Sequence, residues 1–313
     1  MIFFKIIRLN NWVKNLFIFL PLFFSGEFFN PIKITNTFYV TLGFSLVTSF
    51  IYIINDIFDI EFDCRKEVFI LGTGESINSI SDNGWERIKN SFSIGINYFL
   101  FHDFVPNVVQ LELNEGEDTF YLENLNKIFH AREHEFRKSL ILLKSNFHWK
   151  NLKKKEIFLS SLPESLKKNI RFCIDHPVPS SSLNEFKEAI KVLQKRKCFT
   201  KQKNAWVPHL RASIGLTTVL CIQNNVKNLY FGGVDLLNKT TFYDENKLNN
   251  TYSLNFIKKN REEKHGTDDT KISAVTISEV LKMINEDPYF SIKLYTVSEF
   301  SRLRDYLNYI NIN

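Results

Sequence analysis

Two stretches whose residues could carry chemistry lie close together between residues 52 and 76. The first is an acidic run, Asp56, Asp59 and Asp63, which follows an apolar segment. At spacings of three and four these carboxylates share one face of a helix, and their oxygens suit a magnesium ion that bridges phosphates. The second is 72–76 (GTGES), which follows a short apolar run. Small residues after a strand let backbone amides approach a phosphate.

Each stretch also has a simpler interpretation. The acidic run is also typical of the solvated end of a helix, and 72–76 of an ordinary tight turn. The turn is not a full GxGxxG motif and no P-loop lysine follows it. The sequence therefore disfavours NAD binding and phosphoryl transfer from ATP.

Further polar residues stand at the expected ends of strands and starts of helices. Asn97 ends one apolar run, 211–215 (RASIG) opens an apolar helix, and Asp235 ends a second run with Tyr243 eight residues later. His265 precedes Gly-Thr-Asp-Asp. An imidazole titrates close to working pH, so a loop histidine beside acids suits a general base. No comparable Gly-Thr-Asp-Asp motif follows any of the other six histidines: His102, His130, His134, His148, His176 and His209.

From residue 66 onward, short apolar runs alternate with longer amphipathic ones, which predicts a parallel sheet with helices on both faces, a Rossmann-like α/β fold. The predicted strands are 68–71, 92–96, 108–113, 140–143, 229–231 and 292–295. The predicted helices are 85–89, 120–138, 183–195, 214–223, 272–285 and 298–308. Residues 150–155 and 177–182 read as exposed connections that bound a small helical insertion, a possible lid.

The overall composition narrows the class of protein. The chain has 313 residues with 44% apolar content, enough for a real core. Its net charge of +6 comes without any motif that reads nucleic acid, so we expect no nucleic-acid partner. The four cysteines form no CxxC pair, which argues against a structural zinc site or a disulfide framework and fits a reducing cytosol. They are Cys64, Cys173, Cys198 and Cys221.

The first 65 residues predict a two-helix transmembrane hairpin. Residues 38–54 contain no charge and are long enough to span, and 16–25 form a shorter apolar run. Basic residues flank this pair on both outer sides, which predicts that both ends lie in the cytosol. They are Lys5, Arg8 and Lys14 before it and Arg65 and Lys66 after it, with Lys33 alone between the two segments.

Two alternatives to the hairpin remain. A cleaved signal peptide also begins with basic residues and an apolar run, but this chain lacks a small-x-small cleavage site and has a second apolar segment. A pair of buried helices in a soluble protein is the other alternative. The hairpin predicts an inner-membrane protein whose remaining residues, 66–313, form a cytosolic domain.

The N-terminal fifth of the chain resembles the opening of the UbiA-type intramembrane prenyltransferases. The resemblance lies in 8–15 (RLNNWVKN), the apolar helix after it, and a second helix that ends in NDxxDxxxD at 55–63. It implies that Asp56, Asp59 and Asp63 hold Mg²⁺ against a diphosphate. The second Asp-rich motif and the further membrane helices of that family have no counterpart after Lys66.

Residues 66–310 are similar to the bacterial sialyltransferases of glycosyltransferase family 42, through the ordered set of motifs from the GTGES turn to His265. The resemblance implies a nucleotide-binding α/β domain with a lid, a CMP-linked sugar donor, and inverting transfer without a required metal cofactor. It implies that His265 is the general base and that Tyr243 stabilises the departing phosphate. It also implies contacts to the nucleotide or donor from Gly72, Thr73, Gly74, Ser76, Asn97, Arg211, Ser213 and Gly215.

Two positions depart from that family's pattern. Leu237 stands where a second tyrosine is expected, and Glu75 would repel a phosphate unless it points away or contacts a sugar hydroxyl. A Kdo-type CMP-sugar or another nucleotide sugar is therefore also compatible with the sequence.

Three functions follow from these patterns. The first is a membrane-anchored glycosyltransferase that moves a sugar from a nucleotide donor to a surface-glycan or lipid-linked acceptor. The second is a magnesium-dependent transferase acting on polyprenyl phosphates. The third is a non-catalytic remnant of a fusion between two such proteins.

Overall fold

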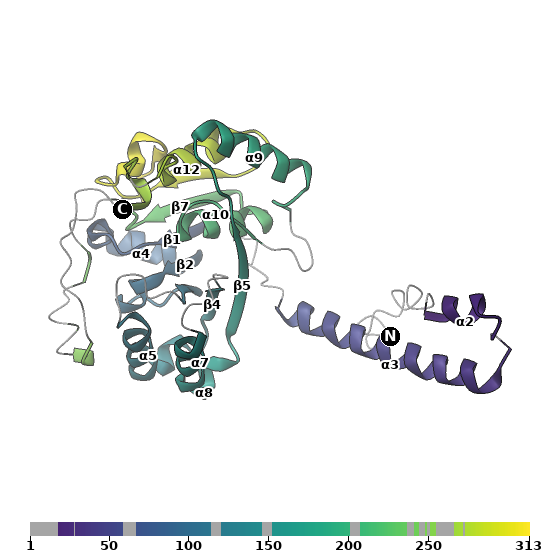
Figure 1. Ribbon diagram of the computed structural model, residues 1–313. Coiled ribbons are helices and arrows are strands. Elements are labelled where there is room, and N and C mark those ends of the chain that lie inside the picture. The colour runs from purple at the N-terminus through teal and green to yellow at the C-terminus, as the bar shows by residue number, and fades with distance from the viewer. Residues whose placement is uncertain are drawn as a thin grey trace. The chain divides into compact units, whose positions relative to one another are not determined.

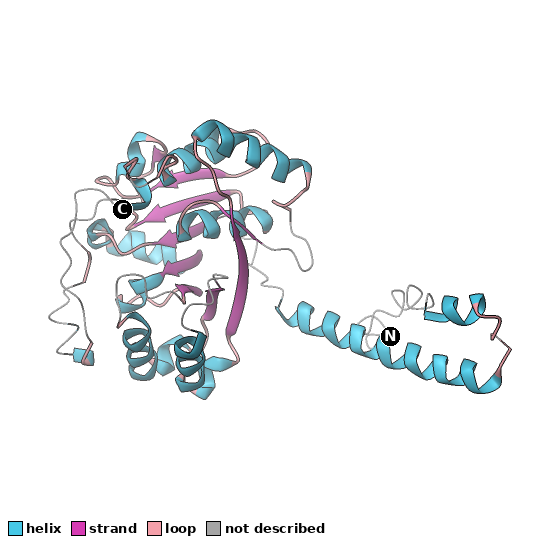
Figure 2. Ribbon diagram, in the orientation of Figure 1, coloured by secondary structure: helices cyan, strands magenta, loops and turns pink. Residues whose placement is uncertain are grey.

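The computed structural model describes residues 18–27, 29–58, 67–113, 120–145, 152–200, 207–236, 241–243, 248, 251–254, 266–271 and 273–313, with the backbone alone for 22, 46–58, 152 and 154. The chain divides into two compact units, Met1–Ile60 and Glu61–Asn313. Figures 1 and 2 show their helices and strands.

The N-terminal unit contains a short helix, α2 (Leu20–Phe24), and a 28-residue helix, α3 (Pro31–Phe58). Helix α3 begins at Asn30, whose side-chain oxygen accepts hydrogen bonds from the amides of Ile32 and Lys33 at 3.1 and 3.3 Å. A proline at its first position also favours the start of a helix. None of the described helices is both long and apolar enough to cross a membrane. The predicted transmembrane character of the hairpin therefore has no support from the described residues.

The larger unit contains a nine-stranded sheet in which every pair of neighbours is parallel, so the α/β prediction is confirmed. The order across the sheet is β6-β5-β4-β3-β2-β1-β7-β8-β9. The strands are β1 (Glu67–Leu71), β2 (Phe92–Ile96), β3 (Val108–Glu112), β4 (Leu140–Ser145), β5 (Ile170–Pro177), β6 (Val207–His209), β7 (Asn228–Gly232), β8 (Lys293–Thr296) and β9 (Asn308–Tyr309).

Helices cover both faces of this sheet (Figure 1). Alternate residues of β3 and β4, such as Val109 and Ile141, pack in one core cluster with α5 and α7. Gln110, between two such residues of β3, instead donates to the carbonyl of Ser213 in α10, so α10 covers the opposite face. The described α-helices of this unit are α4 (Asp82–Lys89), α5 (Tyr121–Ala131), α6 (Glu133–Phe136), α7 (Leu152–Ser161), α8 (Glu164–Lys167), α9 (Leu183–Lys195), α10 (Ser213–Gln223) and α12 (Ile277–Glu286).

The predicted lid is wrong, because the segment between its two expected connections belongs to the main layers of the domain. It contains α7, α8 and β5, and β5 pairs with β4 from Ile170 onward. Phe158, Leu162 and Leu166 are buried in the same core cluster as α5. Strand β5 escapes a search for apolar runs because Arg171, Asp175 and His176 interrupt it.

Two predicted helices also differ from the structure. The helix predicted over 120–138 is divided at Arg132 into α5 and α6. The helix predicted over 298–308 is wrong, because 302–305 form a single 3₁₀ turn, η5 (Arg302–Asp305), and Asn308 begins the edge strand β9. Pairing of β9 with β8 satisfies the backbone of this last segment in place of a helix.

Candidate functional site

The strand order reverses between β1 and β7. From β1 the chain proceeds through β2 to β6 on one side, and β7 to β9 lie on the other side. In open α/β sheets, ligands bind outside the carboxyl ends of the strands at such a reversal. The turn that the sequence singled out, Gly72–Ser76, follows β1 at this point, as predicted.

The structure uses the first amides of that turn within the protein. The amides of Gly72 and Gly74 donate to the carbonyls of Gly232 and Gly233 at 2.8 and 2.7 Å. A Cβ on Gly74 would overlap the carboxylate of Asp235, so only glycine allows the two loops to lie this close. These two amides are therefore not available to a phosphate in this arrangement.

Ser76 also joins the two loops. The carboxylate of Asp235 accepts the Ser76 amide at 3.0 Å and the Ser76 hydroxyl, and the hydroxyl lies 2.7 Å from that of Ser298. Ser76 and Asp235 are both buried. The carboxylate thus satisfies the start of the 3₁₀ helix η2 (Glu75–Ser79), where the prediction had placed a nucleotide. Glu75 is exposed.

Tyr243 is brought to the same edge of the sheet. Residue Thr241 forms a bridge with Gly74, and the Phe242 amide donates to the Thr73 carbonyl at 3.2 Å. The Tyr243 ring lies 6.2 Å from the ring of Tyr98 and 5.2 Å from that of Phe101, centroid to centroid. Both rings belong to the 3₁₀ helix η3 (Asn97–Phe101), which follows β2 directly.

Asn97 and Arg211 share two features among the predicted site residues. Each has a left-handed backbone, with φ of 52° and 76° respectively. Each also buries a polar atom that has no hydrogen-bond partner in the described part of the chain, Oδ1 of Asn97 and Nε of Arg211. Burial lowers the pKa of Arg211 below its ordinary value. Unpaired buried polar groups and left-handed backbones both cost free energy, and they concentrate where proteins bind ligands.

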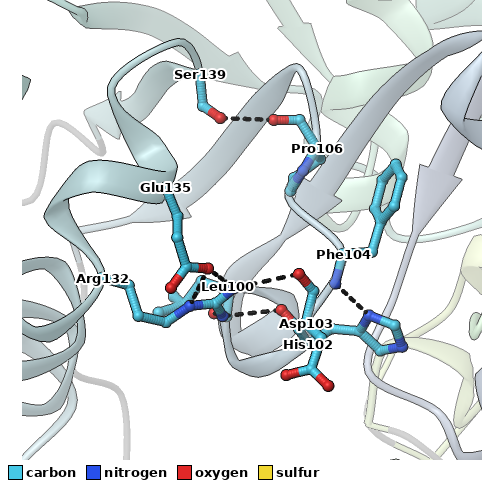
Figure 3. Close-up of polar contacts among 8 residues, drawn as sticks. All are labelled: Leu100, His102, Asp103, Phe104, Pro106, Arg132, Glu135 and Ser139. Carbon is cyan, nitrogen blue, oxygen red and sulfur yellow. Dashed lines mark hydrogen bonds and ion pairs between the residues drawn. The ribbon is translucent and has the colours of Figure 1, made fainter.

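A buried arginine fixes the loop that follows Asn97 (Figure 3). The guanidinium of Arg132 donates to the carbonyls of Leu100, His102 and Asp103 at 2.6, 2.8 and 3.3 Å. It also forms an ion pair with Glu135 at 2.5 Å. The junction of α5 and α6 thereby fixes the end of η3, and with it the position of Asn97.

Replacing Arg132 should loosen this loop. We expect Arg132→Met to lower the free energy of unfolding by about 2 kcal/mol, because three carbonyls lose a charged donor. Arg137→Met is the matched control, since Arg137 is half exposed and makes only a 3.5 Å ion pair with Glu133. Such a surface pair contributes between about 0 and 1 kcal/mol. Urea denaturation of both variants measures the difference, and equal midpoints would contradict the role of Arg132.

The remaining predicted donor residues lie at the start of α10. Ser213 is its first residue and donates its hydroxyl to Glu112, at the end of β3. Gly215 is buried in the first turn. Sequence reasoning had left Glu112 out, although it stands at the carboxyl end of a correctly predicted strand, which is the signal that could have identified it.

Three further side chains extend from Glu112 and were also missed. Lys144 donates to Glu112 at 2.8 Å, and its Nζ lies 3.4 Å from Nε2 of His209. Nδ1 of His209 lies 3.0 Å from the carboxylate of Asp175. His209 has no acid beside it in the sequence, and the fold supplies one from another strand. Asp175 lies near the end of β5 and His209 ends β6, two strands that the sequence did not reveal.

Several predicted residues lie outside the described part of the chain: the candidate base His265, the metal candidates Asp59 and Asp63, and Leu237. The backbone of Asp56 is in the last turn of α3. Asp268, in the motif after His265, is buried and accepts hydrogen bonds from the amide and hydroxyl of Ser278 at the start of α12. Among the described residues there is no group of three or more side chains able to hold a metal ion.

Comparison with known proteins adds no relatives: no protein-family model matches this chain, and no curated protein is significantly similar to it.

Proposed function

We propose that this protein is a membrane-associated glycosyltransferase that moves a sugar from a nucleotide donor, with a CMP-sugar as the favoured class, to a surface-glycan or lipid-linked acceptor. One observation carries the proposal. Asn97 and Arg211 present unpaired buried polar atoms on left-handed backbone, in loops at the ends of strands β2 and β6 of a parallel sheet. Burying these unpaired atoms costs free energy. A ligand that donates a hydrogen bond to the amide oxygen and places an anion beside the guanidinium would offset that cost.

A nucleotide sugar meets both requirements. Its base amino or ribose hydroxyl group can donate to Oδ1 of Asn97, and its phosphate or sugar carboxylate can accept from Arg211. The inverting reaction breaks the bond between the anomeric carbon and the phosphate oxygen while the acceptor oxygen attacks from the opposite face. His265 takes the acceptor proton, and the Tyr243 hydroxyl donates to the departing phosphate. The transfer itself requires no metal ion.

The decisive experiment measures CMP binding by full-length protein with and without the Asn97 side chain. Asn97→Gly keeps the left-handed backbone and removes the amide, so CMP affinity should fall about tenfold with loss of a buried hydrogen bond. Asn225→Gly is the matched control, because Asn225 has φ of 58° and is exposed at the end of α10. Isothermal titration calorimetry with CMP, UMP and AMP measures both variants.

Two results would count against the proposal. Wild-type protein that binds none of the three nucleotides, nor a CMP-linked nonulosonic acid, would remove the donor class altogether. Equal CMP affinity of Asn97→Gly and wild type would show that the unpaired amide oxygen does not contact the nucleotide.

The N-terminal unit is the part that we propose associates with the cytosolic face of the inner membrane. Helices α2 and α3 expose large apolar side chains, among them Phe23, Phe24, Phe38, Tyr39 and Val40, each more than half exposed. Lipid is the environment in which such surfaces cost least. Full-length protein should stay with the membrane fraction after a high-salt wash, which releases proteins held by charge alone. Complete release into the supernatant would contradict this assignment.

A further inference from the structure

A continuous chain of five polar side chains lies beneath the first turn of α10, which we term the relay: Asp175, His209, Lys144, Glu112 and Ser213. Its members come from the ends of β5, β6, β4 and β3 and from the start of α10. Asp175 and Lys144 are almost fully buried, with relative exposures of 2% and 3%. Nothing in the proposed transfer reaction uses the first four of these residues.

Donor and acceptor rules determine the direction of the relay. A lysine ammonium has only donors, so Nε2 of His209 must accept from Lys144. Nδ1 of His209 then carries the proton and donates to Asp175 at 3.0 Å. At the other end, Glu112 accepts from both Lys144 and the Ser213 hydroxyl. Every contact therefore joins one donor to one acceptor when His209 is neutral.

The charges of the relay depend on one another. Burial raises the pKa of Glu112, but the attraction of Lys144 and the hydrogen bonds from Lys144 and Ser213 outweigh it, so its pKa lies below the ordinary value. Burial and the nearby Asp175 raise the pKa of Cys173 to about 12, which leaves this neighbouring thiol uncharged. Lys144 is almost fully buried, and its ammonium group forms an ion pair with Glu112 at 2.8 Å. Buried ion pairs rarely stabilise a fold more than apolar packing would, which points to a role in placing Ser213.

The first turn of α10 is held to the sheet by the same end of the relay. Gln110 donates to the Ser213 carbonyl at 3.2 Å and accepts from Thr217 at 2.5 Å. Helix α10 has no side-chain cap at Ala212, so two bonds tie its first residue to β3: the Gln110 amide to the Ser213 carbonyl and the Ser213 hydroxyl to Glu112. Arg211, two residues before Ser213, belongs to the same loop.

We propose that Asp175, His209, Lys144 and Glu112 are positioning residues that act through Ser213 and hold the start of α10, with Arg211, in the orientation that receives the sugar donor. This inference rests on the proposed function for the identity of the ligand, but the positioning itself is a property of the fold. Its test therefore needs one measurement with a donor and one without.

The measurement without a donor is amide hydrogen exchange of the full-length protein. Glu112→Gln removes the charge from the one oxygen, Oε1, that accepts from both Lys144 and Ser213, so both bonds weaken. The first amides of α10 with helical hydrogen bonds, those of Leu216, Thr217 and Thr218, should then exchange at least about tenfold faster. His209→Gln should have the same effect from the far end of the relay. Ser213→Ala tests the last link without leaving Lys144 unpaired. His130→Gln is the control, because His130 is exposed and contacts the Ser161 carbonyl outside the relay.

A spectroscopic signature tests the direction of the relay. Full-length protein labelled with ¹⁵N-histidine, with His209→Gln for assignment, should show His209 as the neutral tautomer protonated at Nδ1. A proton on Nε2 at neutral pH would overturn the relay, since that nitrogen could not then accept from Lys144.

The measurement with a donor separates positioning from stability. In Glu112→Gln and His209→Gln, the KM for a CMP-linked nonulosonic acid should rise about tenfold with kcat changed less than about threefold, the pattern of lost ground-state binding. Unchanged exchange at residues 216–218 in both variants would overturn the inference. Faster exchange in a protein that neither binds nor uses a donor would keep the positioning role and reject the proposed function instead.

Discussion

Arg211→Gly should reduce the use of the donor by about a hundredfold while leaving the fold as stable as wild type. The guanidinium has a buried Nε without a partner, so its removal takes no hydrogen bond from that atom in the free protein. Glycine also relieves the left-handed backbone at φ of 76°, which offsets the entropy that glycine costs in the unfolded chain. Loss of a charged contact to an anion costs about 1.5–3 kcal/mol, equivalent to about 10- to 150-fold in kcat/KM.

The control for this change is Lys197→Gly. Lys197 is also a cation on left-handed backbone, with φ of 57°, and it is exposed after the end of α9. Its replacement should leave kcat/KM for a CMP-linked donor unchanged. Thermal unfolding measured beside the transfer assay distinguishes the two outcomes. A large loss of stability in Arg211→Gly would show that the arginine serves the fold, and unchanged kcat/KM would remove it from the donor site.

Among the described glycines of the larger unit, Gly215 should be the one at which adding a methyl group, as in Gly215→Ala, lowers the free energy of unfolding most. A Cβ at this position would overlap the Leu210 carbonyl oxygen and lie 2.7 Å from its carbonyl carbon. Both atoms are backbone, so no side-chain rotation can relieve the overlap, and the start of α10 must move away from the loop after β6. We expect a loss of about 3 kcal/mol or more in the free energy of unfolding. Donor use should fall with it, because Ser213 and Arg211 move together.

Gly43→Ala provides the comparison. Gly43 lies within α3, in the other unit, and nothing stands within 4 Å of the place where its Cβ would be. Alanine has the higher helix propensity by about 1 kcal/mol, so this variant should be as stable as wild type or more so. Urea denaturation followed by tryptophan fluorescence measures both. A Gly215→Ala midpoint equal to that of wild type would mean that the close contact with Leu210 is absent in solution.

The core of the sheet could be predicted from sequence because its strands are buried on both faces. Residues Val68–Leu71 of β1 are completely buried, and such strands appear as continuous apolar runs. The missed strands lack that signal. Polar residues interrupt β5, while β6 and β9 are edge strands of three and two residues.

The candidate site divides in the same way. Sequence alone singled out Asn97, Arg211 and Ser213, because polar residues of these types follow strands or begin a helix. The carboxyl ends of parallel strands lie at one edge of the sheet, so residues at such positions lie near one another. Whether the atoms of a turn remain free depends on contacts between distant segments. Asp235 reaches Ser76 across 159 residues of sequence and withdraws it from any ligand.

The alternation of apolar and amphipathic segments alone predicted the parallel α/β architecture, since burial of apolar strands depends on local composition. Only the tertiary structure decided which polar groups at that edge are paired. Glu112 meets Ser213 across 101 residues and Lys144 meets His209 across 65. A change of a few tenths of an ångström in the donor–acceptor distance decides whether two side chains form a hydrogen bond. Strand order and register determine these distances, and the local sequence does not show them.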